Sequence, residues 1–187
     1  MSLRLFAAIP IPEEIAERLL ALETEVPGAS WRSAEQYHLT LRFFGDIDEA
    51  MARDLDNELG LIVEAPFEIA LAGAGSFGGR EPSALWAGVD APPALARLAS
   101  LCEKAARRAG LSPESRKYKP HVTLAYLRGT SDHDGAMFQQ DAAEFRTDKF
   151  WVDHFVMYSS WSTRGGSAYR EEAVYPLIGR PAPIPEV

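Results

Sequence analysis

The sequence predicts an α+β fold made of two pseudo-symmetric lobes, each a mainly antiparallel sheet with flanking helices, with an active cleft between the lobes. The pattern His-x-Thr-Leu occurs twice, at His38 and at His121, 83 positions apart (121 − 38). Each copy completes the same series of elements: a buried strand, prolines, an amphipathic helix, a loop and the motif strand. Because no low-complexity linker separates the copies, we expect one two-lobed domain over residues 1–187.

The first series begins with the apolar run "RLFAAI" (residues 4–9), which has the composition of a buried strand. Pro10 and Pro12 end this strand, and a helix is expected from Glu13 to the Pro27-Gly28 stop. The segment "YHLTLRFFG" (37–45) alternates as a strand does. Residues 48–63 then predict a helix, because Met51, Leu55, Leu59 and Val63 recur at steps of four.

The second series repeats this order. It consists of the strand candidate "ALWAGV" (84–89), the Pro92-Pro93 punctuation, a helix that ends near Gly110, and the motif strand "KPHVTLAYL" (119–127). Two further segments, "FEIALAGAGSF" (67–77) and "FWVDHFVMYSS" (150–160), predict the strands that follow each motif. The proline-rich "RPAPIPEV" at 180–187 is expected to be peripheral.

The composition narrows the class of protein. A hydrophobic fraction of 47% and a charged fraction of 25% are ordinary for a soluble globular domain. The net charge of −8 argues against coating long stretches of nucleic acid, although a local basic patch can still hold one or two phosphates. No apolar run reaches bilayer length, and the single Cys102 cannot form an internal disulfide. We therefore expect a cytoplasmic monomer with a buried thiol, no membrane contact and no obligatory protein partner.

The repeated motif has a geometric consequence. Side chains alternate along a strand, so the His and Thr of each motif share one face while the residues between and after them can anchor the strand in the core. Two lobes related by approximate twofold symmetry would bring the two His-Thr pairs face to face. The candidate catalytic residues are therefore His38, Thr40, His121 and Thr123.

Such a group of side chains has a definite chemistry. An imidazole titrates near neutrality, so two imidazoles can act together as general base and general acid. Two threonine hydroxyls can donate hydrogen bonds to non-bridging oxygens where negative charge develops. In-line attack at phosphorus requires a base on the entering oxygen, an acid on the leaving oxygen and donors between them.

Other interpretations of the motif histidines carry less weight. At ordinary composition, Thr follows a given His two places later in roughly one case in twenty. Two such matches among four histidines, each at the same place in a repeated unit, favour a function. His133 and His154 lack this context and are assigned no role. Zinc ligands usually lie at short spacing, and neither motif has a second His or a Cys nearby, so we expect neither a metal nor a cofactor.

The paired motifs, together with "RLFAAIPIP", "WRSAEQYHLTLRFFGDI" and "YSSWSTRGGSAYREEAVYPL", resemble the RNA 2′,3′-cyclic phosphodiesterases, also called bacterial 2′-5′ RNA ligases, within the two-histidine phosphoesterases. The resemblance covers nearly the whole chain. It implies metal-independent hydrolysis of RNA 2′,3′-cyclic phosphodiester ends to 2′-phosphomonoesters. It also implies that His38 donates a proton to O3′, that His121 accepts a proton from water, and that Thr40 and Thr123 donate to phosphate oxygens. The implied partners are RNA ends or nucleotides bearing a 2′,3′-cyclic phosphate.

The chain departs from this family at two places. The family often has Lys-Phe-Leu-Gly after the first motif, where this chain has "RFFG", so Arg42 and Phe44 become candidate RNA contacts. The family often has Arg two residues after the Leu of the second motif, where this chain has Tyr126. Arg128 is the next cation, and on strand alternation it shares the face of Tyr126. These four residues are expected to determine how the RNA is held beyond its end.

Two more segments offer contacts with RNA. "SRKYKPH" places Arg116, Lys117 and Lys119 just before the second motif, either as a solvated loop or as a local attraction for phosphates. Tyr169 and Trp161 can stack on a base or serve as packing residues.

Two alternative functions stay open at this point. In the first, a 5′-hydroxyl replaces water at the same cleft and forms a 2′-5′ linkage. Since water is present at bulk concentration, hydrolysis is expected to dominate. In the second, the protein is a nucleotide-binding module without catalysis, which the intact His and Thr of both motifs disfavour.

Overall fold

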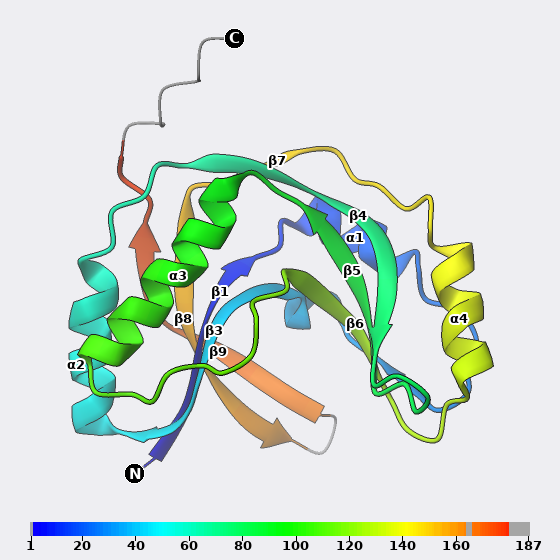
Figure 1. Ribbon diagram of the computed structural model, residues 1–187, viewed down its shortest axis with the longest axis horizontal. Coiled ribbons are helices and arrows are strands. Elements are labelled where there is room, and N and C mark those ends of the chain that lie inside the picture. Colours follow the sequence, from blue (N-terminus) through cyan, green and yellow to red (C-terminus); the bar gives the residue numbers. More distant parts are fainter. Residues whose placement is uncertain (1, 164–165, 180–187) are drawn as a thin grey trace, which may run out of the picture.

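The computed structural model describes residues 2–163 and 166–179, and in this part of the chain the strands join one curled sheet (Figure 1). The strands are β1 (Ser2–Pro10), β2 (Ala29–Trp31), β3 (His38–Asp48), β4 (Phe67–Phe77), β5 (Ala84–Asp90), β6 (His121–Leu127), β7 (Phe150–Val152), β8 (His154–Thr163) and β9 (Gly166–Pro176). The helices are α1 (Glu13–Leu20), the short 3₁₀ helix η1 (Ala34–Gln36), α2 (Glu49–Gly60), α3 (Pro93–Arg108) and α4 (Asp132–Asp141).

The sheet is symmetric about its centre. Its order is β7-β4-β5-β6-β3-β1-β8-β9, with β2 added to β6, and the neighbouring strands pair antiparallel. The two motif strands, β3 and β6, are the central neighbours. Moving outward, β1 and then β8 follow β3, as β5 and then β4 follow β6. This order confirms the predicted α+β fold of two related lobes, because each lobe repeats the same strand order away from the shared centre.

Most predicted elements agree with the structure, and three differ. The helix predicted from Glu13 to the Pro27-Gly28 stop ends at Leu20. The helix predicted to Val63 ends at Gly60, and the Val63 side chain is 66% exposed instead of joining the apolar face. The single strand predicted for 150–160 is divided at Asp153 into β7 and β8. The division has a topological reason, because β7 pairs with β4 in one lobe and β8 pairs with β1 in the other. The segment 180–187, predicted to be peripheral, lies outside the described residues.

The helices cover the sheet and complete the core. In Figure 1, α2 and α3 lie together at one end of the molecule and α4 lies at the other. Leu55 of α2 and Leu98 and Cys102 of α3 are fully buried, so the expected buried thiol is confirmed, and burial raises its pKa. Among the residues described, no helix has the length and apolar character needed to cross a membrane.

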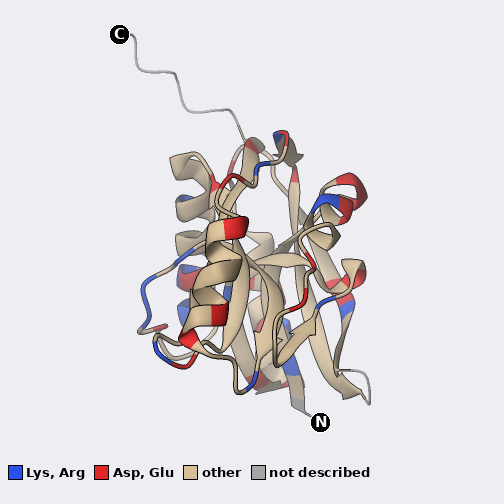
Figure 2. Ribbon diagram, turned by 90° about the vertical axis from the view of Figure 1, so that its right-hand side faces the viewer, with Lys and Arg blue, Asp and Glu red and all other residues tan. Residues whose placement is uncertain are grey.

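Charge is dispersed over the surface. Figure 2 shows acidic and basic positions interspersed over the helices and loops, with no uniformly basic face in that view. Together with the net charge of −8, this surface does not favour the binding of a long stretch of nucleic acid on the face in view.

Candidate active site

The register of the two central strands brings the motifs together. Leu39 of β3 pairs with Val122 of β6, and both side chains are fully buried on the core face. In an antiparallel pair this register sets His38 beside Thr123 and Thr40 beside His121 on the opposite face. Each histidine therefore neighbours the threonine of the other motif. The predicted convergence of the four side chains follows from one cross-strand pair.

Both imidazoles are oriented by the same backbone contact. The Nδ1 atom of His38 lies 2.9 Å from the carbonyl oxygen of Gln36, and Nδ1 of His121 lies 2.7 Å from that of Lys119. In each case the carbonyl is two residues before the histidine. Since a carbonyl oxygen only accepts, Nδ1 carries the hydrogen, and Nε2 is left to accept or donate a proton in the cleft.

Aromatic rings pack around His38. The Phe6 ring centroid lies 4.8 Å from that of His38, Tyr169 meets it edge-on at 5.1 Å, and Tyr158 lies at 6.5 Å. Phe6 belongs to β1, Tyr158 to β8 and Tyr169 to β9. The Gln36 side chain also contacts β9, because its amide nitrogen donates to the Ser167 carbonyl at 2.6 Å. His38 is therefore enclosed on the side where the β8–β9 hairpin covers it.

His121 has a corresponding but more open cage. Phe77 meets its ring edge-on at 4.8 Å, and Trp86 lies at 6.5 Å. The Trp86 ring lies so close to the Gly75 backbone that a Cβ there would approach it to 2.1 Å, so glycine is required for this packing. Lys119 places its ammonium 4.2 Å from the Trp86 ring centroid, a cation–π contact that borders the cage.

The surroundings lower the pKa of both imidazoles. Burial lowers the pKa of His38 to about 4; the hydrogen bond to Gln36 opposes this shift, while the charges of Arg32 and His121 add to it. Burial also lowers the pKa of His121, opposed by its backbone hydrogen bond and assisted by the ammonium of Lys119. In the free protein both rings are therefore held toward the neutral form, His38 more strongly.

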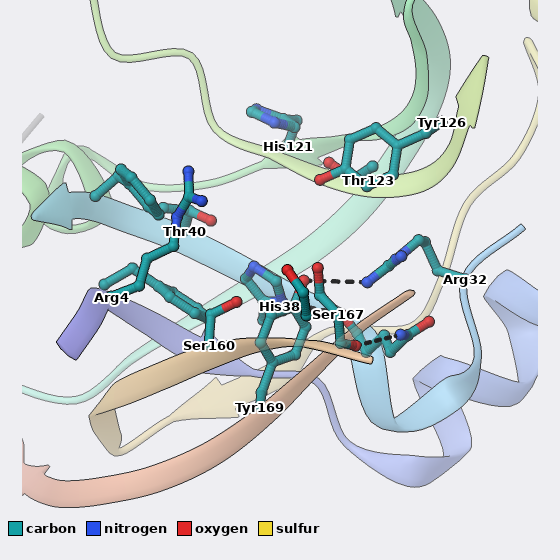
Figure 3. A pocket seen from close by; sticks show the side chains of 14 residues that line it. Arg4, Arg32, His38, Thr40, His121, Thr123, Tyr126, Ser160, Ser167 and Tyr169 are labelled. Carbon is teal, nitrogen blue, oxygen red and sulfur yellow. Dashed lines mark hydrogen bonds between the residues drawn. The ribbon is translucent and has the colours of Figure 1, made fainter. Parts of the chain in front are cut away.

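The four motif side chains line one cleft of about 430 Å³. Figure 3 shows His38 and His121 on opposite walls, with Arg32 entering from the Tyr126 side and Arg4 from the other. The full lining comprises Arg4, Phe6, Arg32, Gln36, His38, Thr40, Phe43, His121, Thr123, Tyr126, Ser160, Ser162, Ser167 and Tyr169. Of the predicted RNA contacts, Tyr126 and Tyr169 lie in this cleft.

Phe44 is a wrong prediction, and a β-bulge explains why. The β1–β3 register shifts between Ala7 and Ala8: Arg42 pairs with Ala7 and Thr40 with Ala8, so Leu41 is the extra residue of a bulge. The shift turns Phe43, which is 37% exposed, toward the cleft and Phe44, which is 8% exposed, into the core. Without the bulge, alternation from His38 and Thr40 would place Phe44 on the cleft face and Phe43 in the core.

The other predicted contacts lie outside the cleft. Arg42 donates from Nε to Glu103 at 2.6 Å and from a terminal nitrogen to the Ser112 carbonyl at 2.8 Å. Arg128 follows the end of β6 and is exposed, and its backbone N–H donates to the Gly28 carbonyl. Trp161 is 41% exposed and carries Arg170 over its ring, while its neighbours Ser160 and Ser162 face the cleft.

A second groove of about 500 Å³ borders the cleft at Thr40, Phe43 and His121. The remainder of its lining comes from β3, from α3 and from the loop that leads into β6: Leu41, Arg42, Ala96, Ala99, Ser100, Glu103, Glu114, Arg116, Lys117, Tyr118 and Lys119. Arg116 is paired with Glu114. The basic loop predicted from "SRKYKPH" therefore lines a groove on the His121 side, next to the central cleft.

The sequence interpretation missed two cations of the cleft, Arg32 and Arg4. Arg32 follows β2, whose pairing with β6 sets Ser30 opposite Tyr126. The position of Arg32 thus depends on a long-range pairing of a three-residue strand, which no local periodicity signals. For metals, the described residues contain no group of three or more His, Cys, Asp or Glu side chains that could hold an ion.

Comparisons with known proteins find a matching family model, related enzymes and similar folds. The sequence model of the 2′-5′ RNA ligase superfamily matches residues 11–163. The RNA 2′,3′-cyclic phosphodiesterase of Escherichia coli K12 is 31% identical over 174 residues, 89% of this chain and 92% of that protein. The enzyme of the same name from Geobacillus stearothermophilus is 30% identical over 186 residues, 94% of this chain, which spans 58% of that relative's length. The crystal structure of E. coli LigT complexed with 3′-AMP superimposes with a TM-score of 0.80 at 26% identity, covering 96% of this chain and 100% of that one.

Proposed function

This chain belongs to the 2′-5′ RNA ligase superfamily, and on that basis we propose that it hydrolyses RNA 2′,3′-cyclic phosphodiester ends to 2′-phosphomonoesters. The observation that carries the proposal is the Leu39–Val122 pair, which sets the two His-Thr motifs face to face in one cleft. The proposal extends to a single domain over residues 1–187 that acts on RNA ends without an obligatory protein partner.

The proposed reaction conserves charge at each step. Water attacks phosphorus and gives one proton to Nε2 of His121, while Nε2 of His38 gives its proton to O3′ as the P–O3′ bond breaks. Because burial keeps His38 neutral in the free protein, this ring takes up its proton together with the anionic substrate, whose charge favours the imidazolium. The product is a 2′-phosphomonoester that carries one negative charge and one P–OH. The imidazole pair carries a single positive charge before and after the reaction, which balances the single charge of the cyclic diester. No metal takes part in this scheme.

Thr40 and Thr123 complete the scheme as donors to the non-bridging oxygens. Each hydroxyl lies beside the histidine of the other motif, so the two donors flank the position between the imidazoles. Donors fixed in this way are effective because they need no reorganisation as charge develops. The buried neighbours Leu39 and Val122 hold both strands in position.

A product analysis tests this function. RNA oligonucleotides that end in a 2′,3′-cyclic phosphate are incubated with the protein in excess EDTA, and the products are separated by the position of the phosphate. We expect a 2′-phosphomonoester at an undiminished rate. A 3′-phosphate product would reverse the substrate orientation, and loss of turnover that one divalent ion restores would refute the metal-free scheme.

The second groove favours one additional candidate reaction, 2′-5′ ligation in the same cleft. It borders His121, the proposed proton acceptor, and its volume is in the range that holds small ligands. A nucleoside seated there would present its 5′-hydroxyl in place of water. Filling the groove with Ala96→Trp should abolish joining of a 5′-hydroxyl RNA and leave hydrolysis unchanged, which the ratio of joined to hydrolysed product measures.

A further inference from the structure

Arg32 is a buried cation for which the described residues provide no carboxylate partner. It is 7% exposed, and its side chain makes two polar contacts: a terminal nitrogen donates to the Tyr169 hydroxyl at 3.1 Å, and the guanidinium lies 5.2 Å from the Tyr126 ring centroid. The ion pairs found within residues 2–163 and 166–179 all involve other cations. A buried charge is costly unless an opposite charge compensates it.

Pairing with β6 fixes the backbone of Arg32 beside the cleft. The N–H of Arg32 donates to the Leu124 carbonyl at 2.9 Å, directly after the β2–β6 pairing. The side chain lines the central cleft and points into it from the Tyr126 side (Figure 3). Arg4, the other cation of the cleft, is exposed to solvent, so water can compensate its charge. Arg32 is therefore the buried cation among the described residues that line this cleft.

The negative charge of the cyclic phosphodiester does not compensate the positive charge of Arg32. In the proposed reaction, the imidazole pair carries one positive charge and the cyclic diester one negative charge, so these two already balance. Arg32 adds one more positive charge in the same cleft. A cyclic mononucleotide with a free 5′-hydroxyl has no second anion, whereas an RNA end has the phosphodiester on the 5′ side of its last nucleoside.

We infer that Arg32 binds the phosphodiester that precedes the terminal nucleoside, so that the cleft selects ends of RNA chains over cyclic mononucleotides. This inference rests on the proposed function. The guanidinium is suited to the task because its planar fork can donate two parallel hydrogen bonds to phosphate oxygens. The guanidinium stacks on the Tyr126 ring, and one of its nitrogens donates a hydrogen bond to the Tyr169 hydroxyl. Both contacts limit the rotation of the guanidinium before RNA binds.

The test varies one charge in the substrate. Two dinucleotides end in the same 2′,3′-cyclic phosphate and carry a 2′-O-methyl group on the first nucleoside. One has a normal phosphodiester between its nucleosides, and the other has an uncharged methylphosphonate. For the unaltered protein we expect kcat/KM to be about 10- to 100-fold higher with the phosphodiester, the range of a charge-assisted hydrogen bond.

Variants then assign this preference to a residue. Arg32→Gln should reduce the ratio of the two kcat/KM values to near one, and Arg32→Lys should leave part of it, because it keeps the charge and loses the fork. Arg4→Gln is the matched control and should keep the ratio. Each variant is assayed at its own pH optimum, since Arg32 also influences the pKa of His38.

A second measurement separates binding from folding. Removing an uncompensated buried charge should leave the melting temperature of ligand-free Arg32→Gln equal to or above that of the unaltered protein. An equal loss of kcat/KM on both dinucleotides would assign Arg32 to the cyclic phosphate and overturn the inference. Lack of preference in the unaltered protein, or its loss in Arg4→Gln alone, would also overturn it. Failure of the unaltered protein to hydrolyse either substrate would reject the proposed function itself.

Discussion

His38 and His121 occupy equivalent positions in the two lobes, yet their surroundings differ on one side. Both follow a carbonyl that holds Nδ1, and both pack against rings from the next strands outward, Phe6 for His38 and Trp86 for His121. The surroundings of the two histidines differ outside these shared contacts. Tyr169 of β9 covers His38, whereas a groove opens beside His121.

This difference separates two contributions to the site. The symmetric centre of the sheet places the four motif side chains, and it does so with the same strands in each lobe. The asymmetric additions, β9 and the β2 segment that ends in Arg32, distinguish one histidine from the other. Two roles therefore become possible on a duplicated framework, because one imidazole is more enclosed than the other.

The largest loss of activity is expected when one histidine of the symmetric pair is removed. His38→Ala and His121→Ala should each lower kcat by roughly 10²- to 10⁴-fold, since each deletes one proton-transfer group. Steady-state kinetics on a cyclic-phosphate RNA measures this loss, and circular dichroism checks the fold. His154→Ala is the control, because His154 is exposed beside Asp153 and lies outside the cleft. Near-normal turnover in either motif variant would break the equivalence of the two lobes.

The threonines test the cross-strand register. Thr40→Val and Thr123→Val should each cost roughly 10²- to 10³-fold in kcat, the range for loss of one oxyanion donor. Thr163→Val, at the end of β8, is a matched control whose hydroxyl donates to the Gly166 carbonyl away from the cleft. Equal costs would support the symmetric placement of the two hydroxyls, whereas a normal rate in one variant would show that only one of them contacts the phosphate.

The pH profile should show the effect of burial on both rings. The catalytic pair must hold one proton, so kcat/KM should be bell-shaped. Because both pKa values lie below the usual 6.5, the maximum should fall on the acid side of pH 6.5. Arg32→Gln should move the acid limb upward, since Arg32 lowers the pKa of His38. The limbs belong to the coupled pair, and a profile that is flat from about pH 4 to 9 would contradict it.

The smallest effect concerns stability. The folded state keeps His38 neutral down to about pH 4, whereas the unfolded chain binds a proton near pH 6.5. This contribution is therefore fully present above pH 6.5 and is lost as the pH falls toward 4. The free energy of unfolding should fall less between pH 7.5 and pH 4.5 in His38→Asn than in His121→Asn. Urea unfolding at the two pH values measures this difference. An equal fall in the two variants would mean that β9 does not distinguish the two sites.

Much of this molecule could be predicted from local sequence. The buried strands, the prolines that end them and the amphipathic face of α3 are all periodic signals within a few residues. The repeated His-x-Thr pattern predicted which side chains share a face, and its occurrence in a duplicated unit predicted two facing lobes. The strand at 67–77 agrees with β4 at both ends. These features depend on neighbours along the chain, so one sequence contains the information.

The remaining features were decided by the tertiary structure. Phe43 replaced Phe44 in the cleft because a bulge at Leu41 shifted the register against β1, and a bulge depends on the partner strand. Arg32 reached the cleft through the pairing of β2 with β6, and Tyr169 reached it through β9. The lowered pKa of His38 is likewise collective, because desolvation sums over rings from several strands. Long-range pairing and burial involve residues far apart in the chain, and no periodicity within a single segment records them.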